Sequence, residues 1–304
     1  MTVRAWAELL RVSALFTVPG DALAGAAAVG RRPNRSTALA VGASLCLYEA
    51  GMALNDWADR DEDAVDRPHR PIPSGRITPR AALTAAGALT AAGLALAARA
   101  GRPALTVATG LAATVWAYDL RLKHTPAGPA AMAAARGLDL LLGATATATA
   151  PATAPATPAR SAVPAALPAA ALLTAHTYAV TAVSRHEARG GSTTAPLAAL
   201  TAVAALGGAA MRERPGEGKR ATAPARLLLT ALTGTYLRTA GRPLVHAALN
   251  PSPPLTQRAV GSGIRAMIPL QAALAARAGA SGTALAVMGL VPLARSLARK
   301  VSPT

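Results

Sequence analysis

Acidic side chains gather in the stretch "GMALNDWADRDEDAVDRPHRPIPSGR", residues 51–76, which holds six of the chain's fourteen Asp and Glu residues. Asp56, Asp59 and Asp63 have the spacing i, i+3 and i+7, which predicts that they share one face of a helix. Mutual repulsion and the negative end of the helix dipole both make such a group favour cations. Carboxylates with a neutral oxygen from Asn55 are ligands that Mg²⁺ prefers. The spacing therefore predicts a Mg²⁺ site. The alternative is a solvated acidic loop, which does not explain the regular spacing.

Two arginines follow the acidic residues closely, in "DRPHRPIPSGR". Arg67 and Arg70 each precede a proline, which biases their backbone toward extended conformations. A stiff loop that holds two guanidinium groups can bind an anion through paired hydrogen bonds. Metal ligands beside such arginines predict a diphosphate site. Because the stretch follows an apolar segment, we expect the diphosphate of a lipid.

The composition indicates a membrane protein. The chain is 52% hydrophobic and 15% charged, and Ala- and Leu-rich segments almost without charge recur along its 304 residues. Segments of about 18 such residues fit a bilayer better than a soluble Ala-rich helical repeat, which is the alternative. The net charge of +17 comes from arginines at the ends of these segments, as in loops that face lipid headgroups. We therefore expect a lipid bilayer as partner and no nucleic acid.

The elements that must position the acidic residues are helices. We expect an all-α, polytopic membrane helical bundle that forms a single domain over residues 1–304. The first helix is expected over 4–29, with a kink at Pro19 and Gly20. The others are expected over 36–57, 79–99, 103–118, 130–150, 163–184, 195–211, 222–239, 256–278 and 281–299. The Pro-rich part of 144–164 is expected to form an external loop.

The acidic stretch resembles the first signature of the UbiA superfamily of intramembrane prenyltransferases, an NDxxDxxxD run followed by DRxxRP. "WAYDLRLKHT" is similar to the Tyr–x–x–x–x–Lys element of that superfamily, which corresponds to Tyr118 and Lys123. "AARGLDLLLGA" resembles its fifth-helix Arg segment, which corresponds to Arg136 and Asp139. The resemblance implies about nine transmembrane helices around a central cavity. It also implies Mg²⁺-dependent transfer of an isoprenoid from its diphosphate to an acceptor.

One part of the sequence departs from that pattern. Most members carry a second aspartate motif, DxxxD, after the sixth helix, where this chain has "TAVSRHEARGG". Glu187 is the acidic residue there, and Arg185 lies two positions before it. The variation resembles the EboC-like branch of the superfamily. Glu187 could hold one ion alone, or Arg185 could replace the ion as a phosphate contact, and an ordinary polar loop is the third reading.

These patterns give a set of candidate site residues. Asp56, Asp59 and Asp63 would hold Mg²⁺, with Glu187 as a further ligand, and Lys123 would help the diphosphate depart. Ionisable side chains inside spans are functional candidates by default, because their burial in lipid is costly. The substrate-binding candidates are Asn55, Arg67, Arg70, Tyr118, Arg136, Asp139, Arg185, Glu187, Glu49 and Asp21.

Other functions remain open at this point. A lyase-type member would ionise the diphosphate and cyclise the tail without an acceptor. A transporter or a non-catalytic lipid-binding protein would use the same charges as a pathway, although the sequence shows no second copy of the acidic run. The acceptor is not indicated. We expect a multi-pass protein of a bacterial cell membrane, with the acidic residues on the cytoplasmic side.

Overall fold

The computed structural model describes residues 2–149, 159–188, 190–212 and 222–292, and these contain helices and turns but no strand. Most of the Pro-rich segment expected as an external loop lies outside them. The helices are α1 (Val3–Leu9), η1 (Val12–Thr17), α2 (Pro19–Ala28), α3 (Arg35–Ala58), α4 (Arg60–Asp66), α5 (Pro79–Ala100), α6 (Arg102–Ala117), η2 (Tyr118–Leu122), α7 (Gly128–Thr149), α8 (Ala159–Ser184), α9 (Thr194–Met211), α10 (Ala223–Leu249), α11 (Pro253–Arg277) and α12 (Ser281–Met288).

The all-α prediction is confirmed, and the chain is an integral membrane protein. In the described part of the chain, five helices are long and apolar enough to cross a bilayer, namely α3, α5, α8, α9 and α11. The expected count of about nine spans stays a prediction. So does the single domain over residues 1–304.

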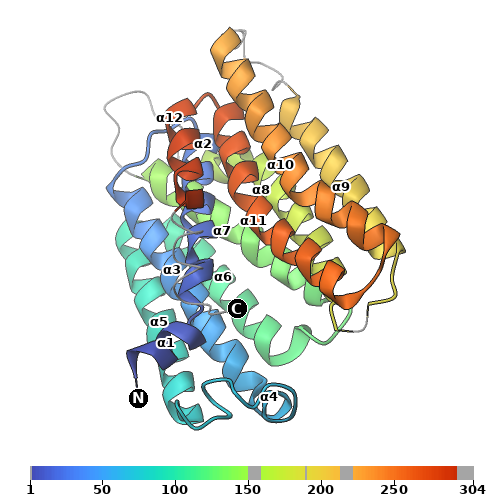
Figure 1. Ribbon diagram of the computed structural model, residues 1–304. Coiled ribbons are helices and arrows are strands. Elements are labelled where there is room, and N and C mark those ends of the chain that lie inside the picture. The colour runs from blue at the N-terminus through green and yellow to red at the C-terminus, as the bar shows by residue number, and fades with distance from the viewer. Residues whose placement is uncertain (1, 150–158, 189, 213–221, 293–304) are drawn as a thin grey trace.

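The long helices form one bundle, in which neighbours along the chain lie side by side (Figure 1). α3 packs on α5, α7 on α8, and α10 on α11, while α2 lies in the middle against α7. The α2–α7 crossing is close because both helices present glycine. A Cβ on Gly25 would lie 2.2 Å from the Leu140 carbonyl oxygen, and one on Gly143 would lie 2.3 Å from the Ala22 Cα. Small residues thus let these two backbones touch, as in other membrane bundles.

The expected first helix is broken into three pieces instead of being kinked. Arg11 follows α1 with a left-handed φ of 49°, which ends the α-helix there. Pro19 is the first residue of α2, where its missing N–H costs no hydrogen bond. The prediction of a continuous helix was wrong because the apolar pattern continues across a strained backbone position.

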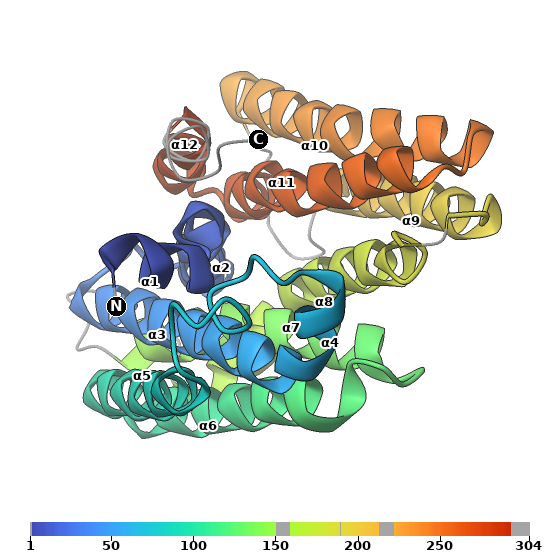
Figure 2. The same cartoon turned by 60° about the horizontal axis from the view of Figure 1, so that its bottom comes forward.

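α3 ends within the acidic stretch. Asn34 caps its start: the Asn34 side chain accepts from the Thr37 N–H, and the Thr37 hydroxyl accepts from the Asn34 N–H. The helix stops at Ala58, Asp59 forms the junction, and α4 starts at Arg60 in a new direction (Figure 2). The acidic residues are therefore shared between two helices.

α10 is longer than expected. The predicted helix over 222–239 continues to Leu249, through Pro243. Pro removes one backbone donor, but neighbouring helices tolerate it inside a membrane bundle. α10 and α11 consequently form a long hairpin, which Figure 2 shows at the outer edge of the bundle.

Candidate functional site

One large cavity opens where α3, η2 and α8 end. Its volume is about 600 Å³. Ten of the predicted site residues line it: Asn55, Asp59, Arg67, Arg70, Tyr118, Lys123, Arg136, Asp139, Arg185 and Glu187. The other four, Asp21, Glu49, Asp56 and Asp63, are not among its lining residues. The cavity thus brings side chains of the acidic stretch together with side chains from the segments around Tyr118, Arg136 and Glu187.

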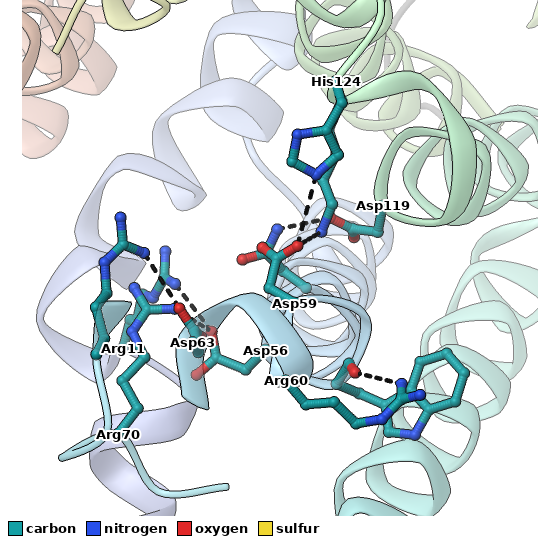
Figure 3. Close-up of polar contacts among 12 residues, drawn as sticks. Arg11, Asp56, Asp59, Arg60, Asp63, Arg70, Asp119 and His124 are labelled. Carbon is teal, nitrogen blue, oxygen red and sulfur yellow. Dashed lines mark hydrogen bonds and ion pairs between the residues drawn. The ribbon is translucent and has the colours of Figure 1, made fainter. Parts of the chain in front are cut away.

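Asp59 faces the cavity and contacts two residues of the turn after η2. Its Oδ1 forms an ion pair with the Lys123 Nζ and lies 3.7 Å from the His124 Nε2 (Figure 3). Glu62 completes a group with Asp59 and His124 whose possible ligand atoms all lie within 4.8 Å of one another. The Asp59 carboxylate therefore binds a positive charge in this structure, the ammonium group of Lys123.

Asp56 and Asp63 form a separate acidic pair that is held by arginines. The Arg70 Nη1 lies 3.3 Å from the Asp56 Oδ1 and 2.7 Å from the Asp63 Oδ2. Arg11 adds a 3.0 Å contact to Asp56. Figure 3 shows Asp56 and Asp63 directed toward these arginines and Asp59 toward His124 and Asp119. The prediction of one shared face was wrong for Asp59, because α3 ends at Ala58 and the chain turns before Asp63.

Two side chains at the site, the buried Asp119 and the partly exposed Arg11, were missed by the sequence reading. Asp119 lines the cavity, and its Oδ1 accepts a 3.1 Å hydrogen bond from the Asn55 amide. Burial raises the pKa of Asp119 to about 6, against the opposing influence of the Asn55 hydrogen bond and the Lys123 charge. Arg11 also lines the cavity. Asp119 directly follows Tyr118 of the Tyr–x–x–x–x–Lys element, so its position in the sequence could have indicated it. No comparable pattern surrounds Arg11.

The loop between α8 and α9 forms one wall of the cavity mouth. The Arg185 Nη1 donates a 2.7 Å hydrogen bond to the carbonyl of Thr125, which ties this loop to the turn after η2. Glu187 is half-buried, and burial raises the pKa of its carboxyl while the nearby Arg67 charge lowers it. The segment at the place of the second aspartate motif therefore contributes Arg185 and Glu187 to the cavity lining.

The deep end of the cavity is polar. The Arg136 Nη1 donates a 2.5 Å hydrogen bond to the Asp21 Oδ2, and the Ser44 hydroxyl donates to Asp139. Asp21 is fully buried behind Arg136, where the Gln271 amide donates to its Oδ1 at 2.7 Å. These contacts make a charged cluster in the interior of the bundle. Such clusters in membrane proteins are rare and mark pathways or sites.

Glu49 lies apart from this arrangement. It stands on α3 seven residues before Asp56, so the two share a helix face. Neither residue lines the cavity, since that face of α3 turns away from it. The expectation that Glu49 contacts the substrate therefore has no support from its position.

The donor atoms around Asp59 suit a hard divalent cation. Asn55 and Asp59 supply an amide and a carboxylate oxygen at the cavity mouth, and Glu187 supplies a carboxylate from another wall. Mg²⁺ prefers oxygen ligands of this kind and keeps part of its shell for water or phosphate oxygens. The arginine-bound carboxylates, Asp56 and Asp63, would be available to an ion only if Arg70 moved away. The residues present thus fit Mg²⁺, with Asp59 as the one of the three spaced aspartates that lines the cavity.

A bidentate ion pair anchors α1 beside the site. The Arg76 Nη1 lies 2.6 Å from the Glu8 Oε2 and its Nη2 lies 3.0 Å from the Glu8 Oε1. Arg76 also donates to the carbonyl of His69. The pair joins α1, which precedes Arg11, to the loop that carries Arg67 and Arg70. Hydrogen bonding to Arg76 lowers the pKa of Glu8 below its usual 4.5.

Comparison with known proteins gives matches in both sequence and fold. The model of the UbiA prenyltransferase family matches residues 13–232. The digeranylgeranylglyceryl phosphate synthase of Methanopyrus kandleri is 36% identical over 129 residues, which cover 41% of this chain and 46% of that protein. The enzyme of the same name from Methanothrix thermoacetophila is 41% identical over 111 residues, 36% of this chain and 42% of that protein. The chain spans less than half the length of these curated relatives.

Solved structures agree over nearly the whole chain. The UbiA homolog from Archaeoglobus fulgidus bound to GPP and Mg²⁺ is 16% identical, with a TM-score of 0.64, and the match covers 94% of this chain and 99% of that one. The homolog from Aeropyrum pernix K1 is 19% identical with a TM-score of 0.61, over 83% of this chain and 96% of that one. At this identity the likeness shows the fold.

Proposed function

This chain belongs to the UbiA prenyltransferase family, and from that membership we propose that it transfers a prenyl group from an isoprenoid diphosphate to an acceptor within the membrane, with Mg²⁺. The observation that carries the proposal is the cavity mouth. There the oxygens of Asn55 and Asp59 line the same mouth as the cations Lys123, Arg67 and Arg70. Ligands for a metal and donors for phosphate oxygens meet in one place.

The cavity has a polar mouth and an apolar middle. Leu47, Leu111, Val115 and Met132 line the part between the mouth and the Arg136 cluster. A diphosphate would bind at the mouth, and an isoprenoid tail would lie against the apolar side chains. The polar mouth would thus suit the charged diphosphate, and the apolar middle would suit the hydrocarbon tail.

Departure of the diphosphate is the step that the mouth would assist. Negative charge builds on the leaving oxygen as the bond to carbon 1 of the tail breaks, and fixed cations stabilise it. Lys123, Arg67 and Arg70 are the groups of this chain proposed for that role. Bound Mg²⁺ would neutralise further charge on the diphosphate. Asp59 would hold the ion with Asn55 and Glu187.

The roles of Asp56 and Asp63 are proposed to be of a different kind. Each contacts Arg70, so their removal would release the guanidinium that faces the cavity. We propose that they position Arg70, and that direct metal binding by them requires Arg70 to shift. Their contribution would then act through the arginine more than through the ion.

The acceptor is proposed to be the hydroxyl group of a phosphorylated glycerol lipid. The two relatives named above are digeranylgeranylglyceryl phosphate synthases, and this chain matches less than half of the length of each. Arg11 at the mouth would bind the acceptor's phosphate. The acceptor oxygen would form the bond to carbon 1 of the tail, while the hydroxyl proton would pass to the released diphosphate.

The proposal is tested by incubating the purified chain in nanodiscs with labelled geranyl or geranylgeranyl diphosphate, Mg²⁺ and a glycerol phosphate lipid. Release of diphosphate with a prenylated lipid supports it. Release with a cyclic hydrocarbon would identify a lyase instead. No release by folded protein, with either donor, would favour a transporter or a lipid-binding protein.

The placement in the cell is part of the same proposal. We propose a bacterial cell membrane with the cavity mouth on the cytoplasmic side, although the relatives named above are archaeal. Arginines lie at both ends of the helices, Arg67 and Arg70 at the mouth and Arg31 and Arg102 at the opposite side, so the orientation is proposed from the chemistry of the site and not from the charge bias. A Cys46→Ala, Ser74→Cys protein tests this, since Ser74 is exposed beside the mouth. Labelling of intact cells by a membrane-impermeant thiol reagent would contradict the orientation.

A further inference from the structure

The last part of the chain is basic and has no acidic side chain at all. After Glu217 the sequence contains neither Asp nor Glu. Besides Arg226 near the start of α10, the hairpin of α10 and α11 carries five basic residues that are exposed on its surface: Arg238, Arg242, His246, Arg258 and Arg265. Within the described residues, none of the five takes part in an ion pair. The balancing negative charge must therefore come from outside the hairpin.

These five residues extend from the membrane edge toward its middle. The turn between α10 and α11 lies on the side of the cavity mouth, because the Gly191 N–H donates a 2.8 Å hydrogen bond to the carbonyl of Pro251. Counted from Pro253 at 1.5 Å per residue, Arg258 lies about 8 Å and Arg265 about 18 Å along α11. The hydrocarbon core is about 30 Å thick, so the backbone of Arg265 lies within it.

Exposure to lipid tails at that depth would be costly for arginine. A charged side chain inside a span is costly, and such residues usually face a partner or a polar cavity. A long side chain can reduce the cost by reaching toward the headgroups. Arg258 and His246, near the turn, can do so, and Arg265 reaches the same way, since its Nη2 contacts Ser262, one helical turn nearer the membrane edge. An anionic partner on this surface would compensate the charge directly.

A small cavity between the two helices provides a place for that partner. Its volume is about 220 Å³, and Pro243, His246, Leu255, Arg258, Ser262 and Arg265 line it. The Arg265 Nη2 donates a 2.8 Å hydrogen bond to the Ser262 hydroxyl, which holds the guanidinium beside the cavity. The cavity is distinct from the one at α3, since the two share no lining residue. Two guanidinium groups and an imidazole, all on exposed residues, thus line one pocket of the hairpin.

We propose that this pocket, lined by His246, Arg258, Ser262 and Arg265, binds the phosphate headgroup of an anionic phospholipid. Arginine binds phosphate oxygens through paired hydrogen bonds, and basic pockets between transmembrane helices suit anionic headgroups. The acyl chains would cover the apolar surface of the hairpin. A second copy of this chain fits less well, because the same face of that copy carries no carboxylate to meet the arginines.

The test uses the full chain in nanodiscs of phosphatidylcholine, with or without a minor fraction of phosphatidylglycerol, and native mass spectrometry to count retained lipids. Wild type should retain phosphatidylglycerol in preference to phosphatidylcholine. In the Arg258→Gln, Arg265→Gln protein we expect the affinity for phosphatidylglycerol to fall about tenfold or more. The matched control is Arg80→Gln, Arg102→Gln, which removes two exposed arginines at other helix starts and should bind as wild type does.

Three results would overturn the proposal. The first is equal retention of phosphatidylglycerol by wild type and by the folded Arg258→Gln, Arg265→Gln protein. The second is wild type that shows no preference for the anionic lipid, a measurement that needs no variant to fold. The third is displacement of the lipid by inorganic phosphate at similar concentrations, which would assign the pocket to free phosphate. None of these measurements depends on prenyl transfer.

Discussion

Lys123 forms an ion pair with Asp59 at the mouth of the large cavity, and so joins the turn after η2 to the junction between α3 and α4. The contact brings together the two sequence elements that most closely resemble the family pattern. It also shows that, of the three spaced carboxylates, Asp59 is the one that faces the cavity. A cation already accompanies that carboxylate, and a divalent ion that binds there would share Asp59 with Lys123 or displace it.

Asp59 and Asp56 should respond differently to the same substitution. We expect Asp59→Asn to lower kcat/KM for prenyl transfer by about a hundredfold or more, because it removes a charge that holds Mg²⁺ beside the diphosphate. Asp56→Asn should lower kcat/KM less, through a displaced Arg70, and should also lower the free energy of unfolding by about 1–3 kcal/mol, since it weakens contacts with Arg11 and Arg70. Kinetics and thermal unfolding of both proteins in the same detergent make the comparison. Equal kinetic losses with unchanged stability would contradict this division.

Much of this arrangement could be predicted from the sequence. The apolar segments gave the bundle, and ten of the fourteen candidate residues line one cavity. The separation of Asp59 from Asp56 and Asp63 could not be predicted, because periodicity assumes a continuous helix and the end of α3 at Ala58 has no strong sequence mark. Arg11 could not be predicted as a site residue for a similar reason. Its place depends on a left-handed backbone in the middle of an apparently continuous apolar helix.

Glu187 and Arg185 should separate metal binding from donor binding. If Glu187 holds an ion, Glu187→Gln should raise the Mg²⁺ concentration needed for half-maximal activity by about tenfold, by analogy with other losses around a metal site. Arg185→Gln should raise KM for the isoprenoid diphosphate and leave the Mg²⁺ dependence unchanged. Activity measured over a matrix of Mg²⁺ and donor concentrations distinguishes the two. An unchanged Mg²⁺ dependence in Glu187→Gln would leave this chain without its expected further ligand.

The buried pair of Arg136 and Asp21 should be a large contributor to stability. Removing one partner leaves a charge buried without compensation, which typically costs about 3–5 kcal/mol. We therefore expect Asp21→Asn and Arg136→Met to lower the unfolding midpoint strongly. Arg102→Gln, at an exposed helix start, is the control and should change stability by no more than about 0.5 kcal/mol. Wild-type stability in Asp21→Asn would show that the pair is not formed.

The Glu8–Arg76 pair should make stability depend on acid pH. The pKa of Glu8 is lowered in the folded state, so its contribution is present above the unfolded value of 4.5 and is lost as pH falls through the lower folded value. The pair is partly exposed, so the contribution should not exceed about 1 kcal/mol. The stability difference between wild type and Glu8→Gln should be largest near neutral pH and vanish below the folded pKa of Glu8. A difference that persists at that acid pH would rule out the pair as its source.

The most direct test of the central claim is calorimetric titration of the folded chain in nanodiscs with geranyl diphosphate, in the presence and absence of Mg²⁺. The account predicts that the diphosphate binds more tightly with Mg²⁺, and that Asp59→Asn loses most of this gain. Binding that is independent of Mg²⁺, or a gain that survives in Asp59→Asn, would contradict it.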